Sequence, residues 1–142
     1  MAKLGPDIRI ANNKKYILCL IRKKWIVLKP EEKVRQYILH QLIHEQHYPP
    51  KYISVEKTLK VNELSKRYDI VVYNQSLVPS ILIECKAEFI EIKEKTLQQI
   101  ATYNLKLNVP FLMVTNGKTS YRFEMKDDNS VQISGFPPFG LL

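Results

Sequence analysis

Apolar residues near the N-terminus fall in short runs that are separated by polar turns. The runs cover Ile8–Ile10, Tyr16–Ile21 and Trp25–Leu28, and Asn, Lys and Arg fill the turns between them. Short apolar runs bounded by turn residues are typical of β-strands. Residues 8–28 are therefore predicted to form a β meander.

The pattern then changes to helical spacing from Pro30 to about Gln46. Pro30 suits the first turn of a helix, the acidic Glu31 and Glu32 favour the same end, and Pro49-Pro50 ends the segment. The predicted core stripe of this helix is Val34, Ile38 and Leu42.

The rest of the chain reads mainly as strands, with one further helix at Glu94–Leu107. The predicted strands are Tyr52–Glu56, Leu59–Val61, Tyr68–Tyr73, Ser80–Lys86, Pro110–Thr115, Tyr121–Met125 and Val131–Ile133, with a turn at Asn62–Lys66. This order predicts an α/β fold, a mixed β-sheet flanked by helices. The length of 142 residues predicts a single domain that spans residues 1–142.

Three charged residues interrupt two runs that are otherwise apolar on both faces. Asp69 lies in the run Tyr68–Tyr73, and Glu84 and Lys86 lie in the run Ser80–Lys86. Burying a carboxylate without a partner or a metal ion costs several kcal/mol. The position of these charges therefore needs an electrostatic reason.

The register of this predicted hairpin brings the charges together. If the loop is Asn74–Pro79 and Tyr73 pairs with Ser80, Asp69 lies opposite Glu84. Lys86 shares the face of Glu84 because alternate residues of a strand point the same way. Two carboxylates suit Mg²⁺ or Mn²⁺, so Asp69 and Glu84 are the candidate metal ligands. Lys86 is placed to orient or deprotonate a water molecule.

The charge balance favours an anionic partner, with nucleic acid first. The formal net charge is +8, and Lys66 and Arg67 directly precede the Asp69 strand, where they are candidate phosphate contacts. Both cysteines lie in apolar runs, and the sequence shows no secretory signal and no stretch of 18 apolar residues. A reduced, cytoplasmic protein is expected.

Several motifs in one order resemble the PD-(D/E)XK nuclease superfamily, and within it the N-terminal domain of type I restriction enzyme R subunits. The motifs are Ile21-Arg22-Lys23-Lys24-Trp25, Pro30-Glu31-Glu32-Lys33-Val34-Arg35-Gln36, Ser65–Tyr73, Ile83-Glu84-Cys85-Lys86-Ala87, Gln99–Asn104 and Val114-Thr115-Asn116-Gly117. The resemblance implies Mg²⁺- or Mn²⁺-dependent cleavage of DNA, with Asp69, Glu84 and Lys86 at the catalytic positions. Tyr68 departs from the Pro that gives the superfamily its name.

The same resemblance implies supporting residues on the two helices. Gln99 and Tyr103 match the family's helix motif and are expected to orient the catalytic residues or the phosphate backbone; in isolation they would read as a surface Gln and a packing Tyr. Superfamily members commonly add a Glu from the first helix. Helical phase favours Glu31 over Glu32, because Glu31 shares the face of the core stripe.

Other interpretations remain open. The three charged residues could instead form a structural ion pair. The protein as a whole could be a DNA-binding module with an idle nuclease site, or a subunit that docks on a helicase or methyltransferase partner. For docking, the apolar tail Phe136–Leu142 is the candidate surface, and a homodimer is a further alternative. His40, His44 and His47 have helical spacing, but a solvated helix face is favoured over zinc. The sequence has no G-x-x-x-x-G-K-[ST] phosphate loop of an ATPase motor.

Overall fold

The N-terminal strands pair into a sheet of their own in the computed structural model, which describes residues 5–61 and 63–142. Strands β1 (Ile8–Ala11), β2 (Lys14–Cys19) and β3 (Lys24–Val27) are antiparallel in the order β1-β2-β3. Asn12 and Asn13 join β1 to β2 with positive φ of 51° and 64°, the backbone of a tight two-residue hairpin. The predicted meander is confirmed.

Helix α1 (Pro30–His40) continues directly into a π-helical turn, Gln41–Glu45, and a short 3₁₀ turn follows at Pro50–Tyr52. The predicted stripe Val34, Ile38 and Leu42 is buried. The predicted extent of this helix was therefore right, but its last turn has the wider π spacing.

The main sheet has six strands in the order β4-β5-β6-β7-β8-β9. The strands are β4 (Ile53–Val61), β5 (Leu64–Tyr73), β6 (Pro79–Cys85), β7 (Phe111–Thr115), β8 (Ser120–Lys126) and β9 (Asn129–Ile133). Only the β6–β7 pair is parallel within the described sheet, and α2 (Glu94–Leu107) makes the crossover that such a pair requires. The two strands predicted at Tyr52–Glu56 and Leu59–Val61 are one strand. The turn predicted at Asn62–Lys66 is shorter, since β5 begins at Leu64; Asn62 itself lies outside the described residues.

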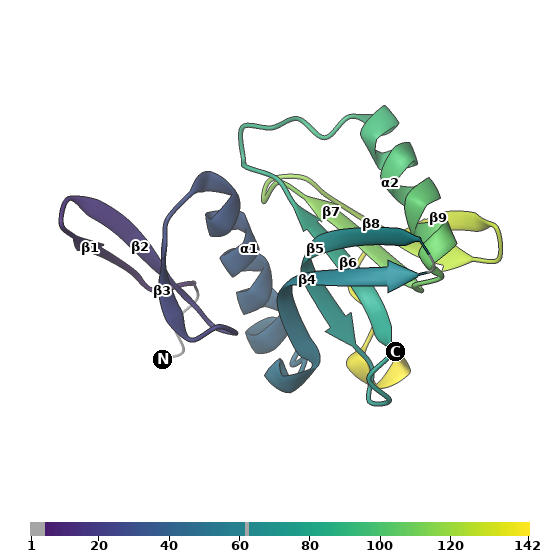
Figure 1. Cartoon of the computed structure of the whole chain (residues 1–142), viewed down its shortest axis with the longest axis horizontal. Helices are drawn as coiled ribbons and strands as arrows, with labels where there is room; N and C mark the ends of the chain where they lie inside the picture. Colours follow the sequence, from purple (N-terminus) through teal and green to yellow (C-terminus); the bar gives the residue numbers. More distant parts are fainter. Residues whose placement is uncertain (1–4, 62) are drawn as a thin grey trace.

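One helix covers each face of the six-stranded sheet (Figure 1). Ile70, Ile83 and Met113 pack with α1 residues, whereas Val71, Leu82 and Leu112 pack with α2 residues. The predicted α/β fold with a mixed sheet flanked by helices is confirmed. No helix in the described residues has the length and apolar character needed to cross a membrane.

The C-terminal tail is part of the core, so it is not the exposed docking patch that the sequence suggested. Phe136, Phe139 and Leu142 pack on the α1-side core. The Tyr48 hydroxyl donates a hydrogen bond to the carbonyl of Pro137, and the Phe139 ring lies 5.6 Å from the Tyr48 ring. Within this tail Leu141 is the large apolar residue that stays exposed.

Candidate active site

Strands β5 and β6 bring Asp69 and Glu84 to facing positions. The ladder pairs Val72 with Ile81 and ends at the pair Ile70–Ile83. The next position on each strand is a carboxylate, Asp69 on β5 and Glu84 on β6. The predicted register holds here, although the hairpin closes through a Tyr73–Pro79 pair after a shift, and not through Tyr73–Ser80 as predicted.

A local irregularity determines where Asp69 points. Tyr68 and Val71 are three residues apart, yet both pack on the α2 side, so strict strand alternation is interrupted between them. The β4–β5 ladder also lacks a Glu56–Asp69 pair, and Glu56 has a positive φ of 52°. The Asp69 carboxylate accepts a hydrogen bond from the Cys85 backbone N–H, 2.7 Å from Oδ2.

Glu84 is a mostly buried carboxylate with an unsatisfied oxygen. Its Oε1 has no hydrogen-bond partner among the described residues, and its Oε2 lies 4.0 Å from Lys66 Nζ. Burial raises the pKa of Glu84 to about 7; the negative charge of Asp69 adds to this rise, and the charges of Lys66 and Lys86 oppose it. The two carboxylates are therefore close enough to repel each other.

Lys86 is half-buried directly after β6. Its backbone N–H donates to the Thr115 carbonyl at 2.8 Å, which holds it beside the end of β7. The side chain of Asn116 then donates to the Ile90 carbonyl at 2.9 Å and ties down the loop after Lys86. The backbone of Lys86 and the loop that follows it are thus fixed by hydrogen bonds.

The ammonium group of Lys66 and the ring of Tyr68 lie next to each other beside Glu84. The Lys66 ammonium lies 4.8 Å from the ring centre of Tyr68 and 5.6 Å from that of Tyr103. The Tyr68 hydroxyl donates to Asn104 Oδ1 at 2.5 Å, and burial, with the nearby charge of Glu84, raises the pKa of Tyr68. In the sequence, Tyr68 stood out only as a departure from the family motif. Its position in an apolar strand was the signal that its ring is buried.

Glu32, and not Glu31, is the buried acidic residue of α1. The helical phase had favoured Glu31 as the inward-facing side chain, and this was wrong. Glu31 is exposed, whereas Glu32 is 6% exposed. Arg35 donates two hydrogen bonds of 3.0 Å to Glu32, and Arg22 and Gln36 donate one each at 3.0 Å. Burial opposes ionisation of Glu32, but these donors and charges lower its pKa overall.

Arg35 connects this acid to the predicted site. Its Nη1 lies 3.8 Å from Asp69 Oδ1, and this nitrogen is buried without a hydrogen-bond partner among the described residues. Arg22, in the turn between β2 and β3, also reaches Glu56 at 3.4 Å. A chain of charges therefore runs from the N-terminal sheet through Glu32 and Arg35 to Asp69, which the sequence did not reveal.

Besides Glu31, two more predicted site residues lie outside these contacts. Gln99 is exposed on α2, and no contact with the three central charges is seen for it within the described chain. Arg67 is exposed on β5, where it pairs with Thr58 of β4. Lys66 and Tyr103 therefore lie close to the candidate site, whereas Gln99 and Arg67 lie at the surface.

The three histidines occupy different settings. His40 is half-buried, with its ring 5.2 Å from that of His44, and burial followed by the charge of His44 lowers its pKa. His44 is exposed, and His47 lies beyond the helix with a positive φ of 59°. In residues 5–61 and 63–142, no three His, Cys, Asp or Glu side chains are arranged to hold a metal ion.

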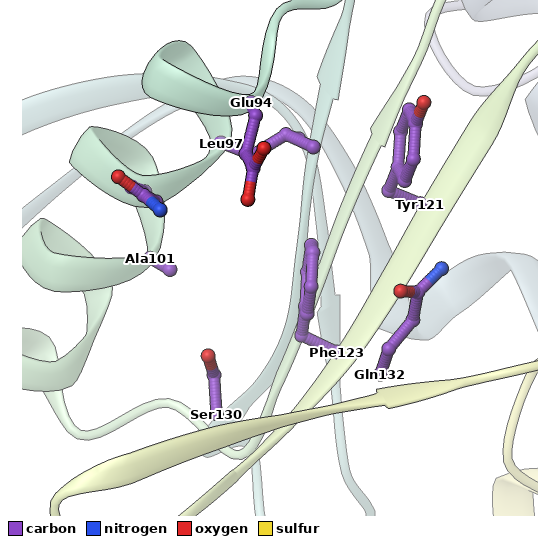
Figure 2. Close-up of a pocket in the computed structure, with 8 residues that line it drawn as sticks. Glu94, Leu97, Ala101, Tyr121, Phe123, Ser130 and Gln132 are labelled. Atoms are coloured by element: carbon purple, nitrogen blue, oxygen red, sulfur yellow. The ribbon is translucent and has the colours of Figure 1, made fainter.

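A pocket of about 330 Å³ lies between α2 and the strands β8 and β9 (Figure 2). Leu97 and Ala101 of α2 and Phe123 of β8 supply apolar surface, and Glu94 and Gln132 supply polar groups. None of the predicted site residues lines it. The perturbed and converging charges lie instead around Asp69 and Glu84, which is where we place the candidate site.

A comparison with protein families supports the resemblance seen in the motifs. The family described as type I restriction enzyme R protein N terminus matches residues 30–137, from the start of α1 to the C-terminal tail. A search of curated proteins finds no match. The match spans the strands and helices that surround Asp69, Glu84 and Lys86, but it does not include the N-terminal sheet. The chain belongs to the family of type I restriction enzyme R protein N-terminal domains.

Proposed function

We propose that this domain is a metal-dependent DNA nuclease with its site at Asp69, Glu84 and Lys86. The observation that carries the proposal is the state of Glu84: a buried carboxylate with a pKa raised to about 7 and an oxygen without a hydrogen-bond partner among the described residues. A bound cation would satisfy that oxygen and stabilise the ionised form. Membership of a restriction enzyme family supports this assignment.

Asp69 and Glu84 are the residues that would hold Mg²⁺ or Mn²⁺. Two carboxylates from adjacent strands fit Mg²⁺, which keeps several of its water ligands and needs only one or two protein carboxylates. This requirement is compatible with the lack of a three-ligand cluster in the described residues. When bound, the ion would polarise a phosphate and acidify a water molecule.

The lysines next to the carboxylates have separate proposed roles. Lys86, whose charge acts on Glu84, would orient the attacking water and offset charge at the phosphate. Lys66 lies 4.0 Å from Glu84 and would hold this carboxylate ionised. Gln99, Tyr103, Arg67 and Glu31 stay as proposed supporting or DNA-contacting residues. Tyr103 contacts this group through Lys66.

The family suggests a restriction complex as the setting, with DNA as substrate and a helicase or methyltransferase as partner. Cys19 and Cys85 are both free and buried, and we propose a cytoplasmic location in keeping with reduced thiols.

Cleavage of plasmid DNA with Mg²⁺ or Mn²⁺ tests the proposal. Wild-type protein should nick or cut DNA, chelation should stop the reaction, and Lys86→Ala should lower the rate by about 10²-fold or more. Lys51→Ala, which removes an exposed lysine on the 3₁₀ turn Pro50–Tyr52, serves as the matched control and should cleave normally. Cleavage that survives Lys86→Ala, or protein that binds metal and DNA but never cuts, would reject the proposed reaction.

A further inference from the structure

The positive charge of the chain is concentrated outside the part that matches the family. Residues 5–29 contain seven Lys and Arg but a single acidic residue, Asp7. From residue 30 onward, 14 basic residues are nearly balanced by 13 acidic ones. The N-terminal sheet β1–β3 therefore supplies most of the net charge of +8, and the family match at 30–137 does not cover it.

One face of this sheet packs against the domain. Ile17 and Cys19 of β2 are fully buried, and Ile26 of β3 packs on the α1-side core. Figure 1 shows β1–β3 on the side of α1 away from the six-stranded sheet. The opposite face of the small sheet is therefore turned away from the core.

Strand pairing identifies the side chains on that outer face. Cross-strand partners share a face, and the pairs are Arg9–Tyr16, Leu18–Trp25, Tyr16–Val27 and Ala11–Lys14. The Arg9 guanidinium lies 4.4 Å from the Trp25 ring centre. Neither core cluster of the described residues includes Tyr16, Leu18 or Trp25. The outer face thus combines two aromatic rings with exposed cationic groups.

Among the described residues, no acidic side chain pairs with the lysines at the two ends of the sheet. Lys14 and Lys15 begin β2, and Lys23 and Lys24 lie at the β2–β3 turn, all exposed. Lys14 shares the outer face with Tyr16, whereas Lys15 and Lys24 share the face of Ile17 and Ile26. None of these four lysines forms a salt bridge with a described residue. The six residues of β2 separate the two groups by roughly 20 Å. A strand of nucleic acid presents phosphates over such a length and bases between them.

We propose that the outer face of β1–β3 is a binding surface for single-stranded DNA, with phosphates on Lys14 and on Lys23 of the β2–β3 turn and bases stacked on Tyr16 and Trp25. Cationic grooves that carry aromatic rings bind single strands in this way. Arg22 sits in the β2–β3 turn and contacts Glu32, which contacts Arg35 beside Asp69. A strand leaving the surface at this turn would lie near the candidate site. The inference goes beyond the proposed cleavage, because binding here needs neither metal nor reaction.

Trp25 is the only tryptophan in the chain, so its fluorescence reports on this surface directly. A short single-stranded oligonucleotide added in the presence of chelator should quench Trp25 emission. Lys14→Gln/Lys23→Gln should weaken binding several-fold and reduce the slope of log affinity against log salt by about 1.4, the value for two lost phosphate contacts. The charge-matched control Lys51→Gln/Lys126→Gln, at exposed sites elsewhere, should leave affinity and slope nearly unchanged.

Aromatic variants separate stacking from charge. In fluorescence polarisation with a labelled oligonucleotide, Trp25→Leu should weaken binding about tenfold at unchanged net charge, and Trp25→Tyr should restore most of the affinity. Circular dichroism and thermal melts establish that each variant is folded. DNA binding without quenching, or equal losses in the Lys14/Lys23 and control variants, would overturn the proposal. So would a Trp25 signal that responds to an acidic peptide and not to DNA. Loss of cleavage with binding intact would reject only the proposed reaction.

Discussion

The Asp69 carboxylate accepts a hydrogen bond from the backbone N–H of Cys85 at 2.7 Å, so one candidate carboxylate is attached to the strand that bears the other. Cys85 follows Glu84 directly, and Arg35 approaches Asp69 from α1. This contact holds Asp69 close to Glu84 even though the charges repel. The repulsion and burial at this pair are the basis of the first two predictions.

Asp69→Asn should keep the fold and lose metal binding. The Asn side-chain oxygen can still accept from Cys85, so we expect the free energy of unfolding to change by no more than about 1 kcal/mol. Asp69→Ala removes the acceptor and should cost about 1 to 3 kcal/mol. Chemical denaturation measures both values, and Mn²⁺ calorimetry measures binding. A greater loss of stability in Asp69→Asn than in Asp69→Ala would contradict this account.

Glu84→Gln should stabilise the metal-free protein at neutral and basic pH. The pKa of Glu84 in the folded protein, about 7, lies above its ordinary value of 4.5, so the folded protein takes up a proton between these values that the unfolded chain releases. Wild-type stability should therefore fall as pH rises through this window. We expect a gain of roughly 1 to 3 kcal/mol at pH 8 that vanishes near pH 4.5.

Denaturation at several pH values tests this dependence, with the exposed Glu91→Gln as control. The control should show no comparable gain at pH 8. A pH-independent effect of Glu84→Gln would argue that the carboxylate is ionised in the folded protein without cost.

Glu32→Gln should destabilise the protein at neutral pH by roughly 2 to 4 kcal/mol, because it leaves the buried Arg35 without its closest countercharge. The pKa of Glu32 is lowered in the folded state, so its contribution is complete above the ordinary Glu pKa and is lost as pH falls through the folded value. The deficit of Glu32→Gln in urea melts should shrink in acid. Its exposed neighbour gives the control: Glu31→Gln should cost less than about 0.5 kcal/mol.

Tyr68→Phe should cost about 1 to 3 kcal/mol, because it removes the donor to the fully buried Asn104 oxygen. The Asn104 amide nitrogen has no hydrogen-bond partner among the described residues. The substitution would therefore remove the hydrogen bond that the described residues supply to the Asn104 side chain. Thermal melts should show a clear decrease for Tyr68→Phe and little change for Tyr37→Phe, whose side chain is exposed. Equal melting temperatures would mean that the hydroxyl finds another partner.

Local patterns in the sequence were sufficient for most elements. The approximate range Glu94–Leu107 predicted for the second helix matches α2, and the meander and the register that places Asp69 across from Glu84 also followed from spacing and turn residues. These features depend on periods of about 3.6 and 2 residues, which the sequence displays directly. Motif order gave the family, which the match over residues 30–137 confirms.

The tertiary structure decided which charges meet. Glu32 is buried because α1 packs between two sheets, so its inward-facing surface is wider than the single stripe Val34, Ile38 and Leu42. The turn of Asp69 toward Cys85 arises from an irregularity at Glu56 on another strand, which no local pattern in β5 reveals.

The packing of elements distant in sequence also decided the tail and the network of charges. Phe136 and Phe139 look like an exposed apolar segment until Tyr48 and Tyr52 are folded against them. Arg22 and Asp69 are 47 positions apart and are linked through Glu32 and Arg35. Sequence periodicity thus determined the elements and their chemistry, whereas long-range packing determined which of those groups share one site.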